Sequence, residues 1–227
     1  MKGLVLHSGG LDSSTILASA VEECESVIGI SIAYGQKHQD RELRSARDVC
    51  KYYNTEHIEL SIPNIFEGYG STLIDSGTSN PHLTYEEIRA SEGPSPTYVP
   101  FRNGNLLSVA TAIALTEKCD VVYFGAHADD AHNYAYPDCT PEFIGAMANA
   151  INVGTYYSVR LIAPVMWMSK GDIVKWGYSM KVPFELTYSC YEGTEDHCGL
   201  CPTCISRKVA FEEAGVDDPT VYTTVAV

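Results

Sequence analysis

Short apolar stretches alternate regularly with segments of helical periodicity along most of this chain. Strand character is found at residues 2–7, 26–33, 57–62 and 121–125, with a further apolar stretch at 161–165, and helical spacing at 12–21, 40–53, 105–117, 140–153 and 169–180. Strands that alternate with helices form a parallel sheet covered on both faces. We therefore predict an α/β protein with a doubly wound, Rossmann-like parallel sheet, whose ligand binds at the carboxyl ends of the strands.

The stretch from Pro63 to Pro100 interrupts this alternation. It contains four prolines after Pro63 and four glycines, and it shows neither strand nor helix periodicity. Loops of this length are usually functional lids or disordered segments. We predict an irregular insertion here.

The charge of the chain limits its partners. Its 227 residues carry 15 lysines and arginines against 29 aspartates and glutamates, a formal net charge of −14. This sign repels phosphate backbones and anionic lipids, so we expect small-molecule substrates and neither nucleic acid nor membrane as a partner. No apolar stretch approaches the roughly 20 residues of a membrane helix, and no signal peptide precedes the first strand. The expected location is the cytoplasm.

A glycine-rich turn, Ser8–Ser14 (SGGLDSS), joins the first predicted strand to the first predicted helix. Glycines allow positive φ and the close approach of a ligand, while the start of a helix offers free amide hydrogens to a phosphate. The turn lacks the lysine with which a Walker A loop stabilises γ-phosphoryl transfer. The alternative to a phosphate site is a tight turn in which Asp12 caps the helix.

The turn resembles the SGGxDS signature of the PP-loop ATP pyrophosphatase superfamily. Members hold the pyrophosphate of ATP in this loop while an oxygen of the substrate is adenylated. Because pyrophosphate leaves and no phosphoryl group is transferred, a Walker lysine is not needed. The resemblance implies a PP-loop fold, a catalytic Asp12 that helps to hold Mg²⁺, and an ATP site made of Ser8, Gly9, Gly10, Leu11, Asp12, Ser13 and Ser14.

Four of the eight cysteines crowd into one C-terminal segment, namely Cys190, Cys198, Cys201 and Cys204. Without a secretion signal, such clustering indicates a metal site and not disulfides. Four thiolates close a tetrahedron around Zn²⁺, and a closed site is structural because no position is open to water. The alternatives are an iron–sulfur cluster, whose ferredoxin spacing is similar, unliganded thiols, and a site in which His197 replaces one cysteine.

The chain divides near Pro183. We expect residues 1–182 to form the nucleotide-binding and catalytic domain, and residues 183–227 to form a small zinc-binding segment packed on it. Four thiolates around Zn²⁺ carry a charge of −2, which we expect the neighbouring Arg207 and Lys208 to offset.

Further segments narrow the resemblance. YVPFRNGNLLS at 98–108, YPDC at 136–139, PVMWMSK at 164–170 and the cysteine array together look like the 7-cyano-7-deazaguanine synthase family, in order from Gly3 to about Arg207. The resemblance implies an ATP-dependent carbon–nitrogen ligase with Mg²⁺ and structural Zn²⁺, commonly a homodimer. In that reaction, 7-carboxy-7-deazaguanine is adenylated by ATP, ammonia forms the amide, and a second adenylation yields the nitrile.

Two cations are candidates for the catalytic centre. In an acidic protein, a buried cation is needed to hold a carboxylate next to a triphosphate, and the guanidinium of Arg102 can bind an anion through two parallel hydrogen bonds. Lys170, at the start of a late helix, is placed to neutralise pyrophosphate. The alternatives are a surface arginine between loop and helix, and a solvated lysine in the first turn of its helix.

The deazaguanine base offers an N–H edge that a carboxylate accepts, which makes Asp138 the candidate reader of the base and Tyr136 a stacking surface. Asn103 is assigned to the substrate with its neighbour Arg102, and Tyr34, at the carboxyl edge of the second strand, to the nucleotide. The alternative for Asp138 is a turn-forming residue after a proline. Gln36 and His38 follow the same strand as Tyr34, and a structural His38 is the alternative there. For Cys139 we expect a buried thiol and not a nucleophile.

The segment from Gly125 to Tyr136 departs from the short glycine–alanine–aspartate stretch associated with the family. Its two histidines and two aspartates could bind a metal, but we expect a solvated loop. Because it lies next to the predicted base pocket, an enzyme that stops at the amide, or another small-molecule amidotransferase of the superfamily, remains an alternative.

Overall fold

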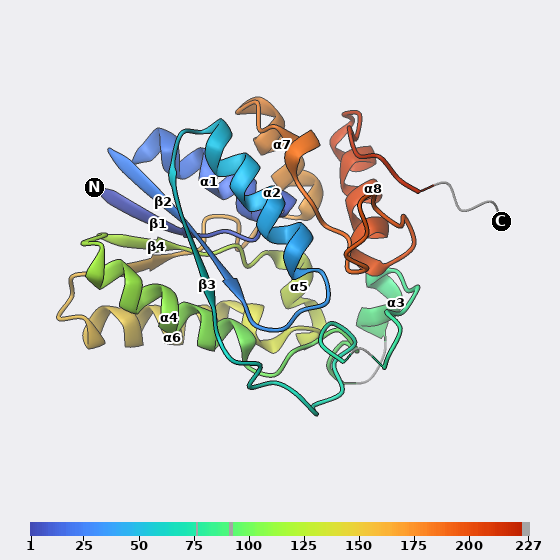
Figure 1. Ribbon diagram of the computed structural model, residues 1–227, viewed down its shortest axis with the longest axis horizontal. Coiled ribbons are helices and arrows are strands. Elements are labelled where there is room, and N and C mark those ends of the chain that lie inside the picture. The colour runs from blue at the N-terminus through green and yellow to red at the C-terminus, as the bar shows by residue number, and fades with distance from the viewer. Residues whose placement is uncertain (76, 91–92, 224–227) are drawn as a thin grey trace.

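The computed structural model describes residues 1–75, 77–90 and 93–223 (Figure 1). A five-stranded sheet has the order β3-β2-β1-β4-β5, and every neighbouring pair is parallel. The strands are β1 (Lys2–Leu6), β2 (Ser26–Ala33), β3 (Glu56–Ser61), β4 (Val121–Tyr123) and β5 (Arg160–Ile162). The predicted doubly wound α/β fold is confirmed.

Helices cover both faces of the sheet (Figure 1). One face carries α1 (Leu11–Glu23), α2 (Gln39–Tyr52), α7 (Lys170–Ser179) and α8 (Pro202–Ala214), and the other carries α4 (Arg102–Thr116) and α6 (Pro141–Gly154). The shorter elements are α3 (Tyr85–Ala90), α5 (Ala128–Ala131) and three 3₁₀ turns at His132–Tyr134, Pro137–Cys139 and Phe184–Leu186.

The two halves of the core meet at the central strand β1. Successive side chains of a strand point to opposite faces. Leu4 accordingly packs in the cluster under α4 and α6, and Val5 packs in the cluster under α1, α2 and α7. Both residues are completely buried. The continuous apolar run of β1 is explained by its central position in a parallel sheet.

The chain winds in opposite directions on the two sides of β1. From β1 it proceeds to β2 and β3, and it then returns to place β4 and β5 on the other side. In open α/β sheets, ligands bind outside the carboxyl ends of the strands at such a switch point. The fold therefore predicts a ligand site at the carboxyl ends of β1 and β4.

The segment between β3 and α4 is irregular, as predicted, apart from the short helix α3, in the residues that the structure describes; residues 76, 91 and 92 of the predicted insertion lie outside them. Backbone hydrogen bonds tie it to itself and to the loop after β4, for example from Thr72 N to Pro96 O and from Ser95 N to Ala135 O. The insertion therefore forms part of the wall around the switch point.

α8 packs against α7 at the end of the chain (Figure 1). α7 begins with a capping box in which Ser169 and Asp172 bond to each other's backbone amides. The division into residues 1–182 and 183–227 stays a prediction, and the last four residues of the second part lie outside the described range.

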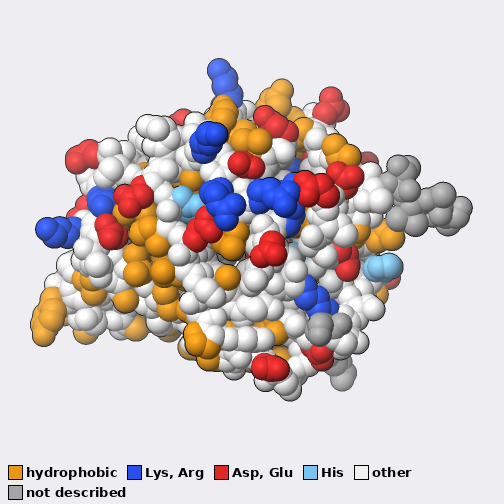
Figure 2. All heavy atoms as spheres, in the orientation of Figure 1, with side chains coloured by type: hydrophobic (Ala, Val, Ile, Leu, Met, Phe, Trp, Pro, Cys, Tyr) orange, Lys and Arg blue, Asp and Glu red, His pale blue; other side chains and the backbone are white. Residues whose placement is uncertain are grey.

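Arginines on the face shown in Figure 2 lie beside carboxylates over α2. Arg44 pairs with Glu195 at 2.8 Å and Arg47 with Glu59 at 2.5 Å. Within the described ranges, no helix is both long and apolar enough to cross a membrane.

Candidate active site

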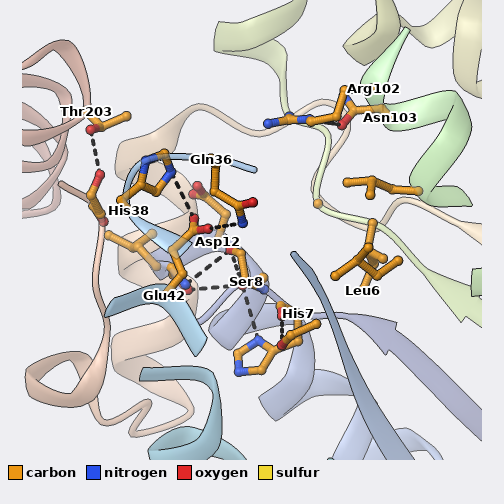
Figure 3. Close-up of a pocket in the computed structure, with 18 of the residues that line it drawn as sticks. Leu6, His7, Ser8, Asp12, Gln36, His38, Glu42, Arg102, Asn103 and Thr203 are labelled. Carbon is orange, nitrogen blue, oxygen red and sulfur yellow. Dashed lines mark hydrogen bonds and ion pairs between the residues drawn. The ribbon is translucent and has the colours of Figure 1, made fainter. Parts of the chain in front are cut away.

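A cavity lies at the carboxyl ends of β1, β2 and β4 (Figure 3). Its walls come from the glycine turn, α2, α4, the loop after β4, the start of α7 and the segment before α8. Most of the predicted site residues line it, namely Ser8, Gly10, Leu11, Asp12, Ser13, Tyr34, Arg102, Asn103 and Lys170. Residues from distant parts of the sequence therefore share one cavity at the switch point.

The glycine turn leaves the start of α1 open. Gly10 occupies the N-cap position in an extended conformation, and no side chain caps the helix. Asp12 lies in the first turn, so the alternative in which it caps the helix is not what the structure shows. The first amide hydrogens of a helix have no partner within it and carry the positive end of its dipole. This turn therefore presents an anion site to the cavity.

Two residues of the turn, Gly9 and Ser14, do not line the cavity. Gly9 has φ of +78°, and a Cβ atom there would lie 2.5 Å from the backbone nitrogen of Ala46 in α2. Only glycine allows this close approach of turn and helix. Ser14 is completely buried, and its Oγ has no hydrogen-bond partner in the part of the chain that the structure describes.

His7 is buried next to the turn and contacts Ser13. It is 1% exposed, and its Nδ1 lies 3.2 Å from Ser13 Oγ. Burial, with a smaller effect of His57, lowers the pKa of His7 to about 3. The imidazole is therefore neutral at physiological pH.

Asp12 lies in a charged cluster. Its Oδ2 is 3.6 Å from Lys170 Nζ and 3.9 Å from His127 Nε2, while Asp130 Oδ2 lies 3.3 Å from the same nitrogen. The Lys170 side chain is only 7% exposed, which disfavours the alternative of a solvated lysine. His127 is 2% exposed, so the expectation of a solvated loop is wrong at this residue, because its imidazole is buried between two carboxylates.

Arg102 lies across the cavity from Ser8 and Asp12 (Figure 3). It donates to Tyr34 Oη at 3.0 Å and, through Nε and Nη2, to Asn103 Oδ1 at 3.1 and 3.0 Å. Burial opposes its charge, but Tyr34 and Asp138 outweigh this and raise the pKa of Arg102 above its ordinary value. The cavity therefore holds a positioned, charged guanidinium.

Asp138 and Tyr136 do not line the cavity. Asp138 Oδ2 accepts the backbone N–H of Asn103 at 2.9 Å, which satisfies the start of α4 and explains why this helix begins three residues before the predicted one. Tyr136 Oη is hydrogen-bonded to Ser95 and Thr97 in the insertion. The structure therefore gives both side chains internal partners.

Glu42 of α2 was not among the predicted site residues, but it lines the cavity together with Gln36 and His38 (Figure 3). Gln36 Nε2 donates to Glu42 Oε2 at 3.0 Å, and His38 Nε2 lies 3.5 Å from Oε1. Burial opposes the negative charge, but His38 and Gln36 lower the pKa of Glu42 below its ordinary value. The spacing of His38 and Glu42, four residues apart at the start of a helix, was the available signal.

The four clustered cysteines come together. The Sγ atoms of Cys190, Cys198, Cys201 and Cys204 all lie within 4.8 Å of one another. Backbone amides donate to two of these sulfur atoms: Cys198 N to Cys190 Sγ at 3.4 Å, and Cys201 N to Cys198 Sγ at 3.3 Å. The arrangement is compatible with a metal site of four thiolates.

Arg207, which was expected to offset the charge of this cluster, lies near it and has partners of its own. It is completely buried, pairs with Asp218 at 3.2 Å, and donates to Thr187 Oγ1 and Phe184 O. Lys208 donates to Gly199 O. That these two cations offset the charge of the cluster stays a prediction.

The cysteine segment also forms a wall of the cavity. Ser189, Tyr191 and Thr203 line the cavity, although each is adjacent in sequence to a cysteine of the cluster. Tyr188 N donates to Gly9 O at 2.9 Å, which links this segment directly to the glycine turn.

Sequence comparisons with known proteins agree on one family. The family described as "Queuosine biosynthesis protein QueC" matches residues 2–215. The 7-cyano-7-deazaguanine synthase of Methanoculleus marisnigri is 37% identical over 224 residues, covering 97% of this chain and 98% of that protein. The synthase of Thermoplasma volcanium is 40% identical over 226 residues, covering 97% of this chain and 90% of that protein.

Among solved structures, NMN synthetase from Francisella tularensis is similar with a TM-score of 0.48 and 14% identity, covering 95% of this chain and 77% of that one. A similarity of this size supports no argument about the site.

Proposed function

The chain belongs to the QueC family of queuosine biosynthesis proteins, and on that premise we propose that it converts 7-carboxy-7-deazaguanine, ammonia and ATP to 7-cyano-7-deazaguanine. Relatives that carry the name of this synthase cover nearly the whole chain. The observation that carries the proposal is the uncapped start of α1, which faces the same cavity as the buried cation Arg102.

The reaction joins two anions. The carboxylate of the substrate attacks the α-phosphorus of ATP, pyrophosphate leaves, and ammonia displaces AMP from the acyl adenylate to give the amide. A second ATP activates the amide oxygen in the same way, and loss of AMP with two N–H protons leaves the nitrile. No side-chain nucleophile is needed, so positioning and charge stabilisation are the main contributions of the protein.

In this proposal the glycine turn holds the phosphates. The open amides of α1 and the hydroxyls of Ser8 and Ser13 surround the pyrophosphate as it leaves, where charge develops. Ser8 Oγ and Ser13 Oγ lie 3.2 Å apart, so one anion can contact both. Gly9 and Ser14 do not contact the phosphates in this arrangement. They contribute to the conformation of the turn from outside the cavity.

Arg102 is proposed to hold the substrate carboxylate. Its contacts to Tyr34 and Asn103 fix the plane of the guanidinium before any substrate binds. A fixed guanidinium can bind a carboxylate through two parallel hydrogen bonds. The carboxylate is thereby kept opposite the phosphate site.

Asp12 is proposed to hold Mg²⁺ at the phosphates. Its Oδ1 is buried and has no hydrogen-bond partner within the described residues, as expected of an oxygen reserved for a cation. When bound, Mg²⁺ would neutralise phosphate charge. Lys170, 3.6 Å from Asp12, adds a second positive charge at the same end of the cavity.

The cysteine cluster is proposed to bind Zn²⁺ with a structural role. Four sulfur donors within 4.8 Å of one another suit a closed tetrahedral site, which leaves no position for a substrate. Zn²⁺ would hold the segment that carries Ser189, Tyr191 and Thr203 against the cavity.

The test is to incubate the purified protein with ATP, Mg²⁺, ammonium and 7-carboxy-7-deazaguanine and to identify the products by mass. We expect 7-cyano-7-deazaguanine, AMP and pyrophosphate. An amide as the only end product would show that the enzyme stops after the first adenylation. Absence of pyrophosphate release with this substrate would overturn the proposal. Light scattering of the same sample tests the further proposal of a homodimer.

A further inference from the structure

Asp130, in the short helix α5 after β4, lines the cavity and has one oxygen without a partner in the described residues. Its Oδ1 is buried and has no hydrogen-bond partner among the residues that the structure describes. Oδ2 lies 3.3 Å from His127 Nε2, and the side chain, 21% exposed, lines the cavity. Leaving a buried carboxylate oxygen without a donor is costly. A ligand in the cavity could supply this oxygen with a partner.

Besides His127, which also faces Asp12, Asp130 has uncharged neighbours in the cavity. Burial first, and then the negative charge of Asp130, hold the pKa of the Tyr85 phenol and of the Cys139 thiol well above their ordinary values. Burial does the same to the pKa of Tyr191. Tyr85, Cys139 and Tyr191 all line the cavity as uncharged groups. This part of the cavity thus offers a flat ring uncharged walls and one anionic acceptor.

The other carboxylates near the cavity are engaged in other ways. Both oxygens of Glu42 have partners, in Gln36 and His38. Asp138 is bonded to Asn103 outside the cavity lining. Asp12 lies at the glycine turn beside Lys170 and is assigned to the phosphate end. Asp130 is therefore the carboxylate best placed to contact a base.

We propose that Asp130, oriented by His127, accepts hydrogen bonds from N1–H and from the exocyclic amino group of the 7-deazaguanine base and thereby selects this base. The inference rests on the proposed function, because it names the residue that recognises the substrate. A carboxylate has about four acceptor positions, so the contact to His127 leaves enough for both donors. The carboxyl group of the substrate is on another edge of the ring, which leaves it free to reach Arg102.

The experiment compares two substrates, 7-carboxy-7-deazaguanine and its analogue without the exocyclic amino group. The wild type is expected to prefer the first by about 10- to 100-fold in kcat/KM, the range for a hydrogen bond to a charged acceptor. The isosteric Asp130→Asn, which replaces an acceptor by a donor, should lose most of this preference while the KM for ATP is unchanged. Titration calorimetry with 7-carboxy-7-deazaguanine alone should show weaker binding to this variant, and melting curves check that it folds.

Asp138→Asn is the matched control, because it makes the same change at the carboxylate outside the cavity. It should keep the preference for the amino group. Loss of the preference in Asp138→Asn and not in Asp130→Asn would overturn the inference. So would an Asp130→Asn variant that keeps the preference but needs more Mg²⁺ and shows a higher KM for ATP, since Asp130 would then act with Asp12. A wild type that neither binds nor converts the base would overturn the proposed function together with this inference.

Discussion

The glycine turn and the cysteine cluster are both places where backbone amides converge, but they use these amides differently. In the cluster, the amides of Glu192, Cys198, Leu200 and Cys201 donate to cysteine sulfur atoms. In the turn, the first amides of α1 have no capping side chain and face the cavity. The cluster therefore pairs its amides with its own sulfur atoms, whereas the turn leaves its amides without a side-chain partner.

This difference has a measurable consequence. Changes at the glycine turn should reduce turnover and leave the fold intact, whereas changes at the cluster should reduce stability first.

The sharpest test of the turn is Asp12→Asn. Because this change removes the negative charge proposed to hold Mg²⁺, we expect kcat to fall by about 10³-fold, the upper range for loss of one charge-stabilising group. The melting temperature should change little, since Asp12 is partly exposed and lies at the cavity. Steady-state kinetics and calorimetry on the same preparation measure both effects. If Asp12→Asn also lowered the melting temperature substantially, the turn and the cluster would not differ in the way proposed.

Cys201→Ser should behave in the opposite way. Cys201 is completely buried in the cluster, and loss of a metal ligand there should lower the free energy of unfolding by about 4 kcal/mol and Tm by about 10 °C. Metal analysis should show substoichiometric Zn²⁺. A variant that kept its melting temperature and lost only catalysis would make the cluster part of the chemistry and not of the scaffold.

Arg102→Lys tests the other wall of the cavity. A lysine keeps the positive charge but loses the planar fork that contacts Tyr34 and Asn103. We expect kcat/KM for 7-carboxy-7-deazaguanine to fall by about 10- to 100-fold, with the KM for ATP nearly unchanged. Full activity of this variant would show that the carboxylate is held elsewhere.

A substitution of His7 tests whether the residues beneath the glycine turn also contribute to stability. Because burial lowers its folded pKa to about 3, the unfolded chain binds a proton between about pH 6.5 and 3 that the folded chain does not. Stability is therefore complete above pH 6.5 and decreases as pH falls, by about 2 kcal/mol at pH 5. Urea unfolding at pH 7 and pH 5 measures the decrease in the free energy of unfolding between the two values. For His7→Gln this decrease should be smaller than for the wild type by the same amount, about 2 kcal/mol. An identical pH dependence in both proteins would argue against the neutral buried imidazole.

The fold could be predicted because each signal was local. Each signal spans a short stretch of sequence: the apolar run of β1, the helical spacing after Gly10 and the spacing of the cysteines. The bounds of α1, α2, α6 and α7 differ from the predicted ones by at most two residues. The cavity lining of Ser8, Asp12 and Arg102 follows from the same topology.

Contacts between distant segments could not be predicted. The partners of Tyr136, which are Ser95 and Thr97, lie in the insertion, where no periodicity fixes a position. The burial of His127 depends on Asp12, which is far away in sequence. The polar composition of the segment around His127 therefore suggested an exposed loop, whereas in the fold charged partners surround this buried side chain.

The hydrogen bond from Tyr188 to Gly9 has a consequence for the newly made chain. The turn that holds Gly9 leaves the ribosome long before the segment that completes its surroundings. A nascent chain that ends before Tyr188 therefore has the turn without its neighbour. We therefore expect the turn to acquire its complete surroundings only after Tyr188 has emerged.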